Sequence, residues 1–428
     1  MGGGLLQLVA FGAQDAYITG NPHITFWKVL YKRHTNFAVE AFRVNFTGAP
    51  TYGQRLVAIV NRNADLIWKT YIEITLPNTG ALKWSAASAR RLGYQMLQQI
   101  EVEIGGQVID RQYGEWLYLW ETLSADFDTS SKLDSLVNNS TYDATTSATS
   151  CNGRPTTLYV PLQFWFNRNP GLALPLIALQ YHEVRFNITL GSSIDLVQDD
   201  GYTSLSAAAA ALPPLTDMAL YIDYVYLDVD ERRRFAQESH EYLIDQVQYT
   251  GQQTITTGSG RIDLTLNHPV KELIWVFQDA RKTSCEAADL TAITADNTQP
   301  FSYNDIVNRA RLQINGQDRF DERYGDYFWK VQPYQHHTAG GTAAWSKSIS
   351  NTNPINMYSF AISPEEHQPS GTCNFSRIDT ATLVFDSITS GVAGTYPSKT
   401  YPYNFRVYAV NYNIFRIMSG MGGLAYSN

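Results

Sequence analysis

Short stretches in which apolar and polar residues alternate recur along most of the chain. A period of two is typical of strands with one buried face, because successive side chains point to opposite faces of a sheet. A helical period of 3.6 is rarer and favours helices only at 85–99 and 231–243. The pattern therefore predicts a mostly β protein with a few short helices. The clearest alternating stretches are RVNF, YIEITL, IEVEIGG, EVRFNITL, RIDLTL, ARLQING, TLVF and FRVYAVNYNIF.

Four phrases occur twice, in the same order, in the two halves of the chain. Asp-Leu-Ile-Trp ends at Trp68, and Glu-Leu-Ile-Trp ends at Trp275. The other pairs are NFTG with QYTG, IGGQVIDRQYGEW with INGQDRFDERYGDYF, and DYVYLDVD with FRVYAVNY. Ordered echoes of this kind indicate a tandem duplication of one module. Trp68 and Trp275 would then occupy the same strand of successive modules, so we expect each to be buried in the core of its own module.

Each half is long enough for an eight-stranded sandwich with long loops. We therefore predict an all-β fold of two tandem eight-stranded jelly-roll β-sandwiches (a double jelly roll), with long loops and a few short helices. The long loops are expected at 124–155, 192–217, 335–356 and 386–402. The expected order is an N-terminal docking arm (1–24), a first jelly roll (25–230), a connector (231–243), a second jelly roll (244–416) and a flexible C-terminal tail (417–428) that packs against a neighbouring element.

Composition argues against direct nucleic-acid binding. Forty acidic residues against thirty-two basic ones give a formal charge of −8, whereas binding to phosphates needs a cationic face. Cys151, Cys285 and Cys373 lie far apart without CxxC spacing, so we expect no disulfide framework and no zinc site, and a reducing compartment fits. No apolar run reaches the roughly 18 residues that cross a membrane, and the first residues lack the basic region of a signal peptide.

The sequence offers little to a catalytic interpretation. A cupin-type metal site needs a His-x-His pair, and the only adjacent histidines, His336 and His337, are expected in a polar loop. The paired carboxylates of a glycosidase and the glycine-rich signatures of nucleotide-binding or hydrolase sites have no convincing counterpart. We therefore expect no catalytic residue, no metal and no cofactor.

Glycans and carbohydrate binding remain as alternatives. Five Asn-x-Ser/Thr sequons occur, of which Asn138 and Asn139 lie in a predicted exposed loop and are the better placed for a glycan. Nine tryptophans and the aromatic residues of the long loops also fit a carbohydrate-binding β-sandwich, because such sites use aromatic platforms. The echo between Trp68 and Trp275 favours a packing role for these two residues instead.

Longer phrases resemble a known family over essentially the whole chain. They are similar to the major capsid proteins of nucleocytoplasmic large DNA viruses, above all those of algal and other giant icosahedral viruses. The phrases are LQLVAFGAQDAYITGNPHITFWKVLYKRHTNFA, PGLALPLIALQYHEV, ERRRFAQESHEYLIDQVQ, LQINGQDRF, QPSGTCNFSRIDTATL and YNIFRIMSGMGGLAYSN. The fold of that family is a double jelly roll, which the internal duplication indicates independently.

The resemblance implies a structural protein rather than an enzyme. It implies a homotrimeric capsomer of pseudo-hexameric outline that contacts neighbouring capsomers, with minor capsid and penton proteins as further partners. The N-terminal arm would lie at the inside of the shell, close to an inner viral membrane, and assembly would take place in the host cytoplasm. Carried over to this sequence, the arm would be anchored by Phe26, Trp27, Tyr31 and Phe37.

Overall fold

The computed structural model divides into two compact units, Met1–Phe37 and Ala38–Asn428, which are described separately below. In the first unit, the helix α2 (Asp15–Thr19) begins where the backbone N–H of Gly12 donates to the Asp15 carboxylate at 2.8 Å. The described residues are 9–10, 12–21, 34–77, 83–84, 91–137, 157–198, 209–255, 258–279, 301, 303–339, 354–388 and 403–426.

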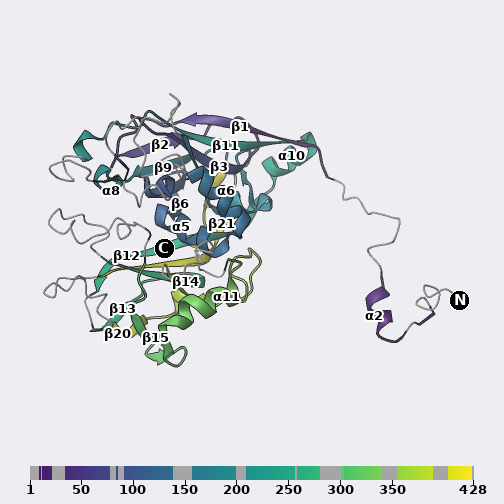
Figure 1. Ribbon diagram of the computed structural model, residues 1–428. Helices are drawn as coiled ribbons and strands as arrows, with labels where there is room; N and C mark the ends of the chain where they lie inside the picture. The colour runs from purple at the N-terminus through teal and green to yellow at the C-terminus, as the bar shows by residue number, and fades with distance from the viewer. Residues whose placement is uncertain are drawn as a thin grey trace. The chain divides into compact units, whose positions relative to one another are not determined.

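The first half of the second unit is a sandwich of two antiparallel sheets (Figure 1). One sheet has the order β1-β11-β3-β7, with the short β8 also pairing with β3, and the other has the order β2-β9-β5-β6. A separate small sheet joins β4 to β10. The strands are β1 (Phe37–Asn45), β2 (Arg55–Ile59), β3 (Leu66–Thr75), β4 (Lys83–Trp84), β5 (Leu97–Ile104), β6 (Gln107–Gln112), β7 (Thr157–Pro161), β8 (Leu174–Pro175), β9 (Val184–Leu190), β10 (Val197–Gln198) and β11 (Asp217–Leu227).

The second half repeats the two four-stranded paths of the first. Its sheets have the orders β12-β21-β14-β18 and β13-β20-β15-β16, so each path of four strands has the same order along the chain as its counterpart in the first half. The predicted double jelly roll is thereby confirmed. The strands are β12 (His240–Ile255), β13 (Gly258–Asp263), β14 (Pro269–Asp279), β15 (Val307–Ile314), β16 (Gln317–Asp318), β17 (Arg323–Tyr324), β18 (Asn356–Ser359), β19 (Cys373–Asn374), β20 (Ala381–Ile388), β21 (Tyr403–Met418) and β22 (Met421–Leu424).

The repeated phrases occupy equivalent places in the two sandwiches. The Ile-Gly-Gly-Gln and Ile-Asn-Gly-Gln phrases form the tight turns β5–β6 and β15–β16. Both central residues of each turn have positive φ: 60° and 85° at Gly105 and Gly106, and 50° and 77° at Asn315 and Gly316. Two-residue hairpins with this backbone favour Gly and Asn, because other residues are strained there. The duplication therefore preserved a turn geometry.

Helices are short and fill the connections. Both helices predicted from periodicity are only partly right. Of the predicted stretch 85–99, the structure describes 91–99, where Leu92–Gln95 form a helix and β5 begins at Leu97. Within 231–243, a helix ends at Gln237, and β12 begins at His240. The helices of this unit are α4 (Leu92–Gln95), α5 (Gly114–Ser124), α6 (Phe127–Val137), α7 (Trp165–Arg168), η1 (Pro170–Leu172), α8 (Ser193–Leu196), α10 (Val229–Gln237), the π-helix η3 (Tyr327–Val331), α11 (Gln332–His336) and η4 (Phe375–Arg377).

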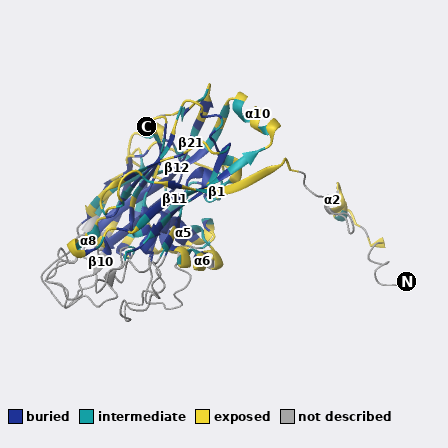
Figure 2. Cartoon of the chain, turned by 90° about the horizontal axis from the view of Figure 1, so that it is seen from above, coloured by how far each residue is buried: buried dark blue, intermediate teal, exposed yellow. Residues whose placement is uncertain are grey.

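Two hydrophobic cores divide the interior. One fills the second sandwich, and the other fills the first sandwich and continues across the outer face of the sheet β12-β21-β14. Strand β14 shows the division: Leu273 and Trp275 point into the second core, whereas Ile274 and Val276 point into the first. Both faces of β14 and most of β21 are therefore buried, which agrees with the dark strands at the centre of Figure 2.

Trp68 does not have the core role expected of it. Trp275 is 2 % exposed and packs on Phe328 in the second core, but Trp68 is only partly buried and belongs to neither core. A β-bulge is the reason. Thr70 lies opposite Ile222 but Ile67 lies opposite Tyr224, so β3 takes three steps where β11 takes two. Because a shift of one residue turns every following side chain to the other face, Ile67 rather than Trp68 faces the core.

The C-terminal segment, expected to be a flexible tail from residue 417, forms a hairpin instead. Strand β21 runs to Met418 and pairs with β22 through a turn with positive φ at Ser419 and Gly420. The hairpin lies against the first sandwich, where the backbone N–H of Tyr181 donates to the carbonyl of Gly420 at 3.0 Å. A Cβ at Gly422 would come within 2.6 Å of Leu179, so glycine allows this close approach.

Candidate functional site at the junction of the two sandwiches

Helix α5 of the first sandwich packs on the outer face of the second sandwich's sheet β12-β21-β14-β18. Tyr249 of β12 and Tyr408 of β21 stack with ring centroids 4.9 Å apart. The ring of Tyr113 lies 4.8 Å from Tyr249, and that of Trp116 lies 5.8 Å from Tyr408. The helix starts at Gly114, where a Cβ would lie 1.9 Å from the carbonyl oxygen of Tyr94. We call this contact the junction.

A buried ion pair crosses the junction. Arg406 of β21 donates from Nε and Nη2 to the two carboxylate oxygens of Glu115 on α5, both at 2.6 Å. The hydroxyls of Tyr408 and Tyr303 also donate to Glu115, at 2.6 and 3.1 Å. Burial acts to lower the pKa of Arg406, but the adjacent Glu115 charge outweighs it and raises that pKa. Burial, reinforced by Glu115, raises the pKa of Tyr408. Arg406 therefore stays charged, and the four hydrogen bonds to Glu115 hold α5 against the second sandwich.

A second cluster surrounds Asp245 at the start of β12. Arg168 from the first sandwich donates to Asp245 at 3.1 Å, and Lys271 from β14 lies 3.5 Å from its other oxygen. Burial acts to raise the pKa of Asp245, but His367, Arg168 and Lys271 together lower it. Lys271 is 1 % exposed, and this burial lowers its pKa despite the Asp245 charge. Buried charges need such partners because desolvation is costly.

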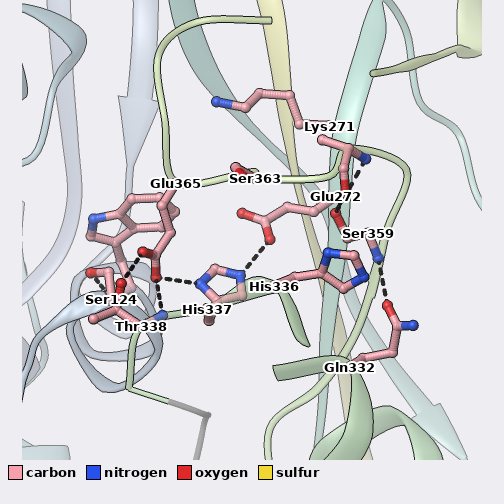
Figure 3. A network of polar contacts seen from close by, with 12 residues as sticks. Ser124, Lys271, Glu272, Gln332, His336, His337, Thr338, Ser359, Ser363 and Glu365 are labelled. Carbon is pink, nitrogen blue, oxygen red and sulfur yellow. Dashed lines mark hydrogen bonds and ion pairs between the residues drawn. The ribbon is translucent and has the colours of Figure 1, made fainter. Parts of the chain in front are cut away.

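His337 forms the third cluster, beside α5. It donates from Nε2 to Glu272 at 2.7 Å and from Nδ1 to Glu365 at 2.8 Å (Figure 3). Its ring meets Trp120 of α5 edge-on. Burial acts to lower the pKa of His337, but the Glu272 charge and the hydrogen bonds to both carboxylates raise it to about 9. His337 lies in the loop after α11, as expected, but it is buried there as a cation, whereas His336 lies within α11.

The chemistry of these clusters is charge pairing. Each acid or base has an opposite charge as its partner, and among the described residues no group of three or more His, Cys, Asp or Glu side chains could hold a metal ion. None of the described helices is long and apolar enough to cross a membrane. The sequence pattern did not indicate that Glu272 and His337 pair. A signal for Glu272 was the charged pair Lys271-Glu272 directly before the apolar run Leu273–Phe277.

Most other residues singled out from the sequence lie outside the described residues. These are the sequons Asn138 and Asn139 and the arm residues Phe26, Trp27 and Tyr31. The fourth arm residue, Phe37, is 54 % exposed, and its ring meets His34 edge-on at 5.6 Å. Anchoring of the arm and glycosylation of the loop therefore stay predictions.

Comparison with known protein families shows which family the chain belongs to. Residues 25–228 match the family described as major capsid protein N-terminus, and residues 231–423 match the family described as large eukaryotic DNA virus major capsid protein. The chain belongs to this family of major capsid proteins. It is accordingly a capsid protein of the virion with a structural role, and its two family segments cover one sandwich each.

Individual capsid proteins resemble the chain along its full length. The major capsid protein of Phaeocystis pouchetii virus is 43 % identical and that of Paramecium bursaria Chlorella virus 1 is 41 % identical, each with complete coverage of both chains. A solved structure of PBCV-1 VP54, fitted into a reconstruction of the virophage Sputnik, superimposes with a TM-score of 0.78 at 37 % identity, over 94 % of this chain and 100 % of that chain. Faustovirus major capsid protein shares the fold, with a TM-score of 0.68 at 12 % identity, over 97 % of this chain and 96 % of that chain.

Proposed function

We propose that the chain trimerises into pseudo-hexameric capsomers that tile the icosahedral shell of a large double-stranded DNA virus. The observation that carries this proposal is the identical strand order of the two sandwiches. Three chains with two equivalent sandwiches each supply six similar units, which suits a hexagonal lattice site. Full-length similarity to capsid proteins, including that of a virus represented by a quasi-atomic capsid structure, supports the same role.

The partners follow from that role. Neighbouring capsomers would contact the sides of the trimer, and minor capsid and penton proteins would complete the shell. The N-terminal arm would lie near an inner membrane, with assembly in the host cytoplasm. We propose no enzymatic activity. The charged side chains within each cluster at the junction pair with one another, and the relatives are named as capsid proteins.

The carbohydrate-binding alternative finds little support in the tryptophans. Among those whose side chains are described, only Trp68 is partly exposed. The buried ones are Trp116, Trp120, Trp165, Trp275 and Trp329. A platform for sugars needs an accessible aromatic face. The burial of these tryptophans therefore indicates that they pack in the interior rather than bind sugars.

The test of the proposed function is the state of the purified full chain. At micromolar concentration and neutral pH, sedimentation should give a mass three times that of one chain, and negative-stain microscopy should show hexagonal outlines. A stable monomer under these conditions would contradict the proposal. A glycan array serves as the test of the alternative, for which we expect no binder.

A further inference from the structure

The junction has a helix side and a sheet side, and the chain carries a second copy of each. On the helix side, Tyr113, Gly114 and Glu115 lead into α5 of the first sandwich. The repeated phrase Tyr324-Gly325-Asp326 leads into η3 and α11 of the second sandwich. A Cβ would lie 2.2 Å from a backbone carbonyl oxygen at Gly325 and 1.9 Å from one at Gly114. The two segments are therefore structural equivalents.

The two helix segments differ in exposure. Tyr113 is packed against Tyr249 and Tyr408 within the junction. Its equivalent, Tyr324, is 62 % exposed, and in α11 Tyr334 is 83 % exposed. Isolated exposed apolar residues are ordinary, but several on one segment indicate an interaction surface. We call Tyr324–His336 the free helix segment.

The sheet side also exists twice. In the junction, the stacked pair Tyr249 and Tyr408 lies on the outer face of the sheet β12-β21-β14-β18. On the outer face of the equivalent sheet β1-β11-β3-β7, Tyr71 and Tyr221 stack with centroids 5.1 Å apart and planes at 3°. Tyr159 meets Tyr71 edge-on and is 37 % exposed. We call this face, defined by these three tyrosines of the first sandwich, the tyrosine face.

We propose that the free helix segment of one chain docks on the tyrosine face of a second copy of the chain, and so repeats the junction between chains. The inference rests on the proposed trimer and names its interface. A head-to-tail contact of this kind is heterologous, and such contacts close into rings when the rotation fits. A closed trimer then contains junctions of one architecture throughout, three within chains and three between them.

Charge distinguishes the two kinds of junction. Within the chain, the helix contributes an acid, Glu115, and the sheet contributes a base, Arg406. Between chains, the acid on the helix side is already paired: Lys330 of the free helix segment pairs with Asp326 of the same segment at 2.7 Å. The tyrosine face carries Glu73 and Asp223, with Lys69 near Asp223.

This difference in charge makes docking on the tyrosine face selective. If α5 met the tyrosine face of another copy, Glu115 would approach Glu73 and Asp223 on that face. Like charges brought together at an interface disfavour the wrong pairing. The order of sandwiches around the ring is therefore forced to alternate.

The experiment uses two full-length variants that each lose one side of the contact. Tyr324→Thr with Tyr334→Gln removes the aromatics of the free helix segment, and Tyr71→Thr with Tyr159→Thr removes those of the tyrosine face. Each variant alone should lose at least tenfold in trimer stability and sediment as a monomer. Circular dichroism and the unfolding midpoint establish that both variants fold.

Mixing the two variants provides the sharper readout. In the mixture, the intact helix segment of one variant meets the intact tyrosine face of the other, so a dimer with one sound contact should form but no closed trimer. Tyr181→Thr, at a tyrosine that is 75 % exposed beside the C-terminal hairpin, is the matched control and should trimerise like the unaltered chain.

The outcomes separate this inference from the proposed function. Variants that trimerise normally, a mixture that gives no dimer, or a control that also fails would overturn the assignment of these two faces while the trimer itself stands. If the unaltered chain is a monomer, both the trimer and its interface are wrong.

Discussion

At the scale of single residues, the junction depends on buried charges that select a pH range. His337 is held as a cation by Glu272 and Glu365, and its raised pKa of about 9 makes its folded form bind a proton more tightly than an unfolded histidine would. Burial acts to raise the pKa of Glu365, but the hydrogen bonds from His337 and Thr338 lower it. The cluster is therefore fully stabilising between about pH 4.5 and 6.5, the ordinary values of the two groups.

The pH dependence of unfolding should report this cluster. The contribution of His337 is complete below pH 6.5 and is lost as the pH rises to about 9, a difference of about 3 kcal/mol in the free energy of unfolding. Denaturant unfolding at pH 6 and pH 9.5 measures it, and His337→Gln should flatten the dependence. The neighbouring variant His336→Gln is the control. If His337→Gln keeps the full pH dependence, His337 is not the cation inferred here.

At the scale of elements, a single bulge gives two matching phrases different roles. Both phrases lie on the same strand of their sandwich, and in both the acidic residue is buried: Asp65 accepts from the backbone N–H of Leu227, and Glu272 accepts from His337. The tryptophans nevertheless differ, because the bulge in β3 turns Trp68 away from the core whereas Trp275 stays in it. The repeated phrase thus marks the same strand in each sandwich, whereas the bulge sets the direction in which the tryptophan points.

Truncating each of the two tryptophans should show their difference in burial as a difference in stability. Trp275→Ala removes a large buried side chain and should lower the free energy of unfolding by roughly 3 to 5 kcal/mol. Trp68→Ala, the matched change at a partly exposed position, should cost clearly less. Urea unfolding of both variants at one pH gives the comparison. Equal losses would show that Trp68 packs as tightly as Trp275.

The same comparison marks what the sequence could predict. Alternation and the repeated phrases were sufficient for the double jelly roll and for the tight turns, since both follow from local pattern. The side-chain direction of Trp68 was not predictable, because the bulge depends on pairing with β11, which is far away in sequence. The junction clusters were equally hidden: His337 lies 65 residues from Glu272 and meets it only after folding.

At the scale of the whole molecule, the two sandwiches share one hydrophobic core. The first core continues over the outer face of the second sandwich's sheet, and the Glu115–Arg406 pair crosses the same boundary with side chains 13 % and 9 % exposed. Shared apolar burial of this kind couples domains more strongly than the polar contacts usual between them. We therefore expect the residues of the second unit to unfold in a single transition.

Removing one member of that pair should uncouple the sandwiches. Glu115→Ala leaves Arg406 buried without its partner, a defect that typically costs about 3 to 5 kcal/mol. Calorimetry should then show a broadened or divided transition. The control is Glu238→Ala, which breaks the exposed pair with Arg234 and should change stability by less than about 1 kcal/mol. An undivided transition at the original temperature would contradict the coupling role of the pair.

The position of β21 has a consequence for synthesis of the chain. This strand pairs with β12, β14 and β22, yet it begins only at Tyr403, near the end of the sequence. While the ribosome is still translating, the first sandwich has all its strands once Leu227 has emerged, but the second lacks its central strand until the last residues appear. A chain terminated before Tyr403 lacks Tyr408, Val410 and Phe415, which β21 contributes to the first core, so we expect such a chain to complete neither core.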